Sequence, residues 1–217
     1  MAKTIPNEEK VFMVSKSTNT IYSGSAALKA MSEWYTMEDV SNTVKPYKVF
    51  TALLTQSGSD TPLNISSGAL TIGITYLITN EAGIVGWDFT NVGAPNNEVG
   101  TYFIATGTTP ANWNNGYLTY NTGAPVATVL ENTIGNVWFT YEDVGFYKGV
   151  SGGLFLENKT VIFTGVSSLD SIFHSSWNDE DPNNGVFLKT YYSSDFDLGV
   201  SSNGVIYNAP IEIRVYN

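Results

Sequence analysis

The sequence predicts an all-β protein: an antiparallel sandwich or barrel-like body, an inserted small β lobe, and an N-terminal arm containing one short helix. Three observations lead to this fold class. Most of the chain consists of short β-branched and aromatic runs, which favour strands. Clusters of Gly, Asn, Ser and Pro separate these runs roughly every ten residues, as in antiparallel sheets joined by turns. One segment near the N-terminus instead has helical periodicity.

That segment lies in residues 1–45, which we expect to form an arm. In "GSAALKAMSEWYTMEDV", Ser25 is a suitable N-cap for a helix at about residues 25–40. The apolar stripe of this helix consists of Leu28, Met31, Trp34 and Tyr35. A helix of this length is marginal alone in water, so the stripe must pack on something. It either covers an open end or edge of the chain's own β body or docks on a neighbouring subunit, and we expect it to serve attachment.

Strand signals dominate residues 46–217, which we expect to form the body. The clearest is "PIEIRVYN", where Ile211, Ile213 and Val215 alternate with other side chains as in a half-buried final strand. β-branched and aromatic runs predict four further strands, at residues 47–56, 69–79, 159–165 and 186–193.

Charge is divided unevenly between arm and body. Residues 1–45 contain five Lys and five acidic residues, so the net charge of −10 lies entirely in residues 46–217. No Lys or Arg occurs from Val49 to Tyr147. Because nucleic-acid binders need cations to displace phosphate counterions, we expect no nucleic-acid partner, and no membrane partner on the same grounds. The imbalance fits a water-facing body that repels its copies, joined to a neutral segment that docks.

The sequence offers few groups for catalysis. Cysteine is absent, which excludes disulfides, thiolate metal sites and a Cys nucleophile. His174 is the only histidine, so a catalytic triad would rest on it alone. Glu142 with Asp143, and Asp195 with Asp197, are candidate pairs for glycoside hydrolysis, but adjacent residues on a strand point to opposite faces and the second pair has the setting of a solvated turn. We therefore expect no enzymatic activity and no cofactor.

The best metal candidate is "NDEDPNNG", where Asp179, Asp181 and Asn183 alternate like the oxygen ligands of calcium loops. The match then fails, because Gly185 falls one place late and Thr190 stands where such loops have Glu. We therefore interpret the stretch as a polar turn and expect no metal, with calcium as the alternative.

Three tryptophans have Asp, Asn or Gly beside them in the sequence, a setting that could form a platform for sugar stacking. They are Trp87, Trp113 and Trp177. Core or subunit-interface packing is the default interpretation, since aromatic side chains dominate β cores, and glycan contact is the alternative. We expect residues 87–113 to serve mainly folding, with turns supplied by Gly, Asn and Pro and with aromatics anchoring a small lobe.

Four pieces of the sequence, "YKVFTALLTQSG", "APVATVLENTIGNVWFTYEDVGFYKG", "KTVIFTG" and "IEIRVYN", together resemble a small β-rich virion protein family of tailed bacteriophages, including crAss-like phages. In simpler members the first two pieces join directly. The resemblance therefore implies that residues 62–123 are an insertion in a hairpin turn, where extra residues cost little closure entropy. Within the insertion, "DFTNVG" and "FIATGTTP" look like a β module of phage tail and head appendages.

The resemblance implies a non-enzymatic virion structural protein, such as a head fibre, capsid decoration or tail component. Its arm would attach to a capsid or tail scaffold and its acidic body would project outward. The expected partners are other virion proteins and copies of the chain in a dimer or trimer. Its expected location is the virion, after synthesis in the bacterial cytoplasm. The alternative is a receptor- or glycan-binding appendage with the inserted lobe as its tip.

Overall fold

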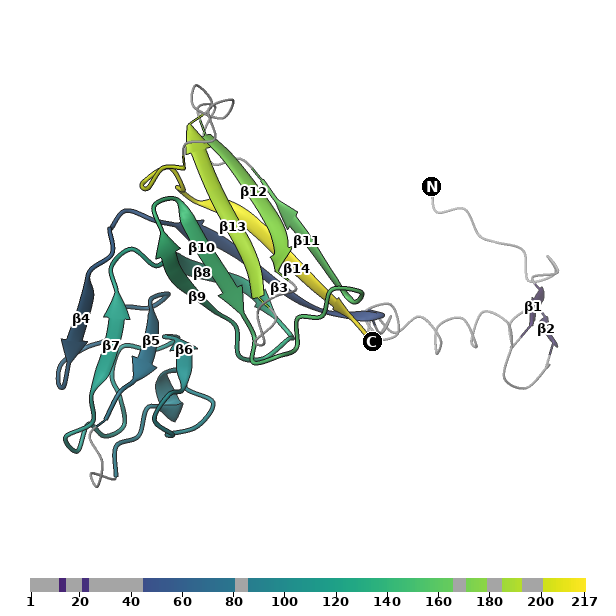
Figure 1. The fold of residues 1–217 in the computed structure, drawn as a ribbon. Coiled ribbons are helices and arrows are strands. Elements are labelled where there is room, and N and C mark those ends of the chain that lie inside the picture. Colours follow the sequence, from purple (N-terminus) through teal and green to yellow (C-terminus); the bar gives the residue numbers. More distant parts are fainter. Residues whose placement is uncertain are drawn as a thin grey trace, which may run out of the picture. The chain divides into compact units, whose positions relative to one another are not determined.

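A computed structural model describes residues 12–14, 21–23, 45–80, 86–165, 171–178, 185–192 and 201–217 of the chain (Figure 1). The chain divides into two compact units, Met1–Lys45 and Pro46–Asn217. The described residues form antiparallel sheets, which confirms the all-β fold class. Within them, no helix has the length and apolar character needed to span a membrane.

The described part of the first unit is a two-stranded antiparallel ribbon. Strand β1 (Phe12–Val14) pairs with β2 (Ile21–Ser23), and Met13 lies opposite Tyr22. The sequence pattern did not predict these strands. The helix predicted at about residues 25–40, with its stripe of Leu28, Met31, Trp34 and Tyr35, lies outside the described residues.

The second unit contains one four-stranded sheet in the order β11-β14-β3-β8. Its strands are β3 (Tyr47–Thr55), β8 (Val126–Asn132), β11 (Thr160–Thr164) and β14 (Ala209–Tyr216). In β14, Ile211 and Ile213 are buried, whereas Glu212 and Arg214, which alternate with them, are half-buried on the other face. The prediction of an alternating final strand is therefore confirmed.

A second sheet has the order β12-β13-β10-β9. Its strands are β9 (Trp138–Asp143), β10 (Phe146–Val150), β12 (Ser171–Asn178) and β13 (Gly185–Tyr192). The two sheets pack face to face as a sandwich-like body (Figure 1), and one core draws on both. At its centre the rings of Phe50 on β3 and Phe139 on β9 lie 5.9 Å apart.

A third sheet, in the order β4-β7-β5-β6, forms the inserted lobe. Its strands are β4 (Pro62–Ile65), β5 (Thr75–Ile78), β6 (Tyr102–Ile104) and β7 (Leu118–Asn121), with a 3-10 turn, η1 (Thr90–Val92), between β5 and β6. The lobe has its own core, which includes Tyr76, Phe89, Phe103 and Leu118. Strand β5 is shorter than the strand predicted at 69–79, because Gly73 has a positive φ of 89° and a turn precedes the strand.

The lobe occupies the turn of a hairpin in the body. Strands β3 and β8 pair antiparallel, with Thr55 opposite Val126. Between them, the chain enters and leaves the lobe side by side, since the Thr122 amide donates to the Thr61 carbonyl at 3.1 Å. Two adjacent segments, at Thr61 and Thr122, therefore connect the lobe to the body, and we call them the neck.

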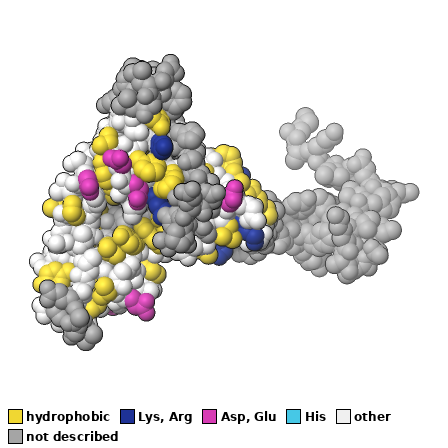
Figure 2. Space-filling model, viewed as in Figure 1, with side chains coloured by type: hydrophobic (Ala, Val, Ile, Leu, Met, Phe, Trp, Pro, Cys, Tyr) yellow, Lys and Arg dark blue, Asp and Glu magenta, His cyan; other side chains and the backbone are white. Residues whose placement is uncertain are grey.

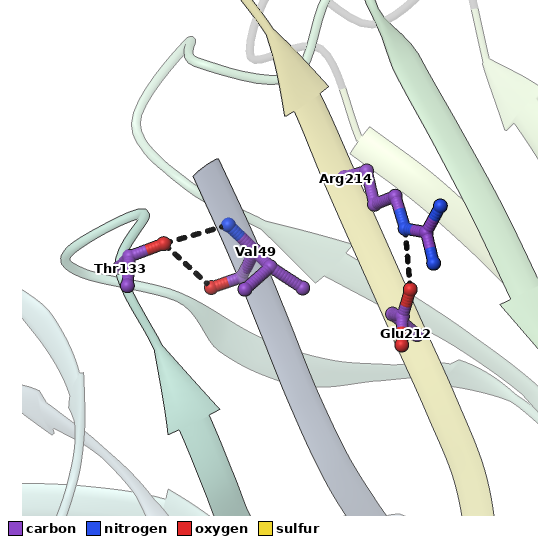
Figure 3. A network of polar contacts seen from close by, with 4 residues as sticks. All are labelled: Val49, Thr133, Glu212 and Arg214. Atoms are coloured by element: carbon purple, nitrogen blue, oxygen red, sulfur yellow. Dashed lines mark hydrogen bonds and ion pairs between the residues drawn. The ribbon is translucent and has the colours of Figure 1, made fainter. Parts of the chain in front are cut away.

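Polar contacts fix the start of the body at β3 (Figure 3). The Val49 amide donates to Thr133 Oγ1 at 2.7 Å, and the Thr133 amide donates to the Val49 carbonyl at 2.8 Å. On β14, the Arg214 side chain donates to the Glu212 carboxylate and lies over the Tyr47 ring. The first strand of the body is thus held from two sides, close to where residues 1–45 join it.

Candidate ligand-binding groove

Strand alternation gives β9 and β10 a shared outer face. On β9, Phe139 is fully buried in the body core, so its neighbours Trp138 and Thr140 point the other way. Across the ladder, Lys148 lies opposite Thr140 and Val150 lies opposite Trp138. These side chains make one wall of a groove.

A β-bulge places a carboxylate at the end of this wall. The pairing passes from Asp143 opposite Phe146 directly to Tyr141 opposite Tyr147, which leaves Glu142 without a partner on β10. Bulges of this kind re-aim a side chain and often lie next to functional sites. Thr140 Oγ1 donates to Glu142 Oε1 at 2.6 Å, so the exposed carboxylate is held beside the wall.

The lobe supplies the opposite wall. Tyr102 of β6 stacks on Trp138, with ring centroids 5.7 Å apart and planes 4° from parallel. Asn136 Nδ2 donates to the Tyr102 carbonyl at 2.7 Å, and the Phe139 amide donates to Thr75 Oγ1 at 3.2 Å. These contacts join the lobe to the body along the edge strand β9.

Two cavities lie along this joint. One, of about 380 Å³, is lined by Gly100, Tyr102, Trp138, Thr140, Glu142, Lys148 and Val150. The other, of about 250 Å³, has walls that include Pro62, Leu77, Thr119, Tyr120, Asn121 and Tyr141. They adjoin, because both are lined by Tyr102, Thr140 and Glu142. We call the two cavities together the junction groove, and its size suits a small ligand.

The ionisable groups of the junction groove influence one another. Burial lowers the pKa of the Lys148 amine, and the charge of Glu142 opposes that shift; Lys148 as a whole residue is 9% exposed. Burial raises the pKa of the Tyr102 hydroxyl, and the negative charge of Glu142 raises it further. Tyr102 is therefore a neutral hydroxyl at neutral pH. The Lys148 stem crosses β13 at Gly185, where a Cβ would overlap it.

The structure places two of the predicted tryptophans, Trp87 and Trp113, in the lobe. Trp87 is 9% exposed in the lobe core, and its Nε1 donates to the Asn97 carbonyl at 3.0 Å. Trp113 is partly buried against that core, edge-on to Phe89, and its Nε1 donates to the Gly68 carbonyl. Neither lines the junction groove. Trp177 lies on β12 opposite Val186.

Of the other predicted candidates, Glu142 lines the groove. Its neighbour Asp143 accepts a hydrogen bond from the Val144 amide in the turn, and His174 lies on β12 opposite Lys189. Among the described residues, no three His, Asp or Glu side chains gather as a metal site would require. Candidates outside those residues are Asp179, Asp181, Asn183, Asp195 and Asp197.

Sequence reasoning missed the junction groove. The alternation of Trp138, Thr140 and Glu142 in "WFTYED" was a usable signal for one wall. The opposite wall comes from the lobe, and no local pattern indicates that Tyr102 reaches Trp138.

Comparisons of the chain with family models, with curated proteins and with solved structures found no match.

Proposed function

We propose that the protein is a non-enzymatic structural component of a bacteriophage virion. In this proposal residues 1–45 attach to a capsid or tail scaffold, and residues 46–217 project outward. The main support for it is that a structural boundary and a charge boundary fall at the same place in the sequence. The boundary between the two compact units falls between Lys45 and Pro46, and the net charge of −10 lies wholly in the residues after it.

The charge division gives each unit a physical role. Figure 2 shows acidic side chains scattered over the visible face of the body rather than gathered in one patch. Such a body repels its copies and stays in water, whereas a neutral segment meets no net electrostatic barrier when it docks. The resemblance of the strand sequences to phage virion proteins is the reason for proposing a bacteriophage virion as the location.

The junction groove favours binding over bond cleavage. Glycoside hydrolysis by the usual route needs two carboxyl groups flanking the scissile bond. Among the described residues that line the groove, Glu142 supplies one carboxylate. This is why we propose a non-enzymatic role.

Attachment is tested by incorporation into particles. A phage lacking the gene is complemented with the full chain, with residues 41–217 alone, or with the full chain carrying Leu28→Ser and Met31→Ser. We expect the first to be present in purified particles and the other two to be strongly depleted, although all are expressed and folded. Normal incorporation of the truncated chain contradicts the proposal.

A matched control makes the same chemical change on the body. Leu63 on β4 of the lobe and Leu130 on β8 are 40% and 61% exposed, so Leu63→Ser with Leu130→Ser replaces two exposed apolar side chains outside the arm. We expect this variant to incorporate normally.

Light scattering on the full chain is expected to report the mass of a dimer or trimer. A measured mass of 23.6 kDa, that of the monomer, contradicts that part of the proposal.

A further inference from the structure

We propose that the junction groove is a binding site for a neutral, extended oligosaccharide, with Tyr102 and Trp138 packing against sugar rings and with Glu142 and Lys148 bonding to hydroxyls. This binding role is distinct from attachment through residues 1–45. Its site also differs from Trp87 and Trp113, two of the tryptophans that the sequence singled out.

The aromatic pair provides the apolar part of such a site. The C–H bonds on one face of a sugar ring carry small positive charges, which suit the negative face of an aromatic ring. The rings of Tyr102 and Trp138 are parallel and stacked on each other, and both residues are partly exposed and line the groove. Because they come from the lobe and the body, the pair is fixed only when the two parts are joined.

The polar groups provide hydrogen bonds of both kinds. Glu142 is an acceptor, the Lys148 amine is a donor, and hydroxyls such as that of Tyr120 can do either. Several are already oriented by the protein. Thr140 Oγ1 donates to Glu142, and Asn121 Nδ2 donates to Asp60 at 2.7 Å. A sugar, whose hydroxyls both donate and accept, matches this mixture.

Charge selects against other ligands. Among the described residues that line the groove, Glu142 and Lys148 are the only Asp, Glu, Lys or Arg side chains. An acidic saccharide or a nucleic acid would meet the Glu142 carboxylate and the net negative body. A neutral ligand meets no such repulsion.

An extended peptide fits less well. A peptide usually adds to a sheet edge through backbone hydrogen bonds. Strand β9 is an edge of its sheet, but the Phe139 amide already donates to Thr75 Oγ1 of the lobe. The lobe therefore covers part of the edge that a peptide strand would need.

The shape favours a chain of sugars over a single one. Each cavity alone lies near the lower end of the size range of small-molecule pockets, and the two adjoin at Tyr102, Thr140 and Glu142. A ligand that fills both must run along the joint between lobe and body.

The test is calorimetric titration of the full chain with five neutral probes, namely cellohexaose, maltohexaose, xylohexaose, mannohexaose and hexa-N-acetylchitohexaose. Hexagalacturonate serves as the acidic comparison. We expect at least one neutral probe to bind more tightly than the acidic one. Glu142→Gln should weaken that binding about tenfold, since hydrogen bonds to charged groups are the stronger ones.

Three variants keep the test decisive. Tyr102→Leu removes the ring and should also weaken binding, with its folding checked by thermal unfolding. Glu131→Gln changes an exposed acid on β8, and Trp113→Ala changes a tryptophan outside the groove, so both should bind like the unmodified chain. The inference is overturned if no neutral probe binds, if hexagalacturonate binds more tightly, or if only Trp113→Ala abolishes binding. Particle incorporation is not measured here, so failure of this inference is distinguishable from failure of the attachment proposal.

Discussion

The body and the lobe of residues 46–217 are both antiparallel, but they are held together in different ways. The body uses long strands: β3 has nine residues and β14 has eight, paired along their whole shared length. The lobe uses strands of three or four residues, with the long segment from Gly86 to Thr101 between β5 and β6. The body is therefore specified by strand alternation, and the lobe by a few side chains that bond to its backbone.

Four neighbouring hydrogen bonds show how the lobe segment is fixed. Asn97 Oδ1 accepts from the Phe89 amide at 2.9 Å, and the Asn97 carbonyl accepts from Trp87 Nε1 at 3.0 Å. Asp88 Oδ1 accepts from both the amide and the hydroxyl of Thr90. Hydrogen bonds that involve side chains thus take the place of strand pairing in this segment. Single substitutions can remove such bonds.

The largest effect is expected in the body core. Phe50 is fully buried and packs on Phe139 of the facing sheet. Phe50→Ala should lower the free energy of unfolding by about 3–5 kcal/mol, because the cavity cannot be filled by short-range shifts. Urea denaturation followed by circular dichroism measures this loss. A loss below about 1 kcal/mol would mean that the two sheets do not share one core.

A smaller and local effect is expected in the lobe. Asn97→Ala leaves the Phe89 amide without its acceptor next to a fully buried ring. The cost should be about 1–3 kcal/mol, the penalty for an unsatisfied buried donor. Hydrogen exchange should show faster opening at residues 87–97 and unchanged protection in β3 and β14.

The control for that variant is Asn96→Ala. Asn96 Oδ1 accepts from the Glu98 amide and from the Thr101 hydroxyl, but in an exposed position where water can replace it. We expect a smaller loss than for Asn97→Ala. Equal losses would contradict the view that burial, rather than the number of hydrogen bonds, sets the cost.

The smallest effect concerns pH. Hydrogen bonds from the Thr90 hydroxyl, the Thr90 amide and Asn97 lower the pKa of Asp88 below its ordinary value of 3.8. The carboxylate therefore stabilises the folded lobe above pH 3.8, and this contribution is lost as the pH falls through the lowered pKa. Urea midpoints from pH 5 to pH 2, read by exchange at residues 87–97, should fall less steeply for Asp88→Asn than for the unmodified chain. Glu98→Gln, which changes an exposed acid of the same lobe, should leave the slope unchanged.

The sequence was most informative where each residue's position follows from its immediate neighbours. The alternation of Ile211 and Ile213 with polar residues predicted β14, and β-branched runs predicted β3, β11 and β13 to within a residue or two at each end. The pattern was less reliable at residues 69–79, where a turn at Gly73 interrupts an apolar run.

The junction groove could not be predicted because it depends on distant segments. Trp138 and Glu142 share a strand pattern, but a bulge sets the direction of Glu142, and bulges leave little trace in alternation. Tyr102 reaches Trp138 only because the lobe is joined along β9 through Thr75 and Asn136. The arm helix and its stripe stay a prediction.

At the neck, the hydrogen bond between Thr61 and Thr122 holds the two ends of the lobe close together. The lobe could therefore be exchanged as one unit. Another domain whose two ends lie as close together could replace it in the β3–β8 turn, with loss of the contacts through Thr75 and Asn136 that join the lobe to the body. Such an exchange would replace the side of the junction groove that carries Tyr102 and keep the side that carries Trp138. The ligand preference that we propose for the groove could then change while the sandwich-like body stayed the same.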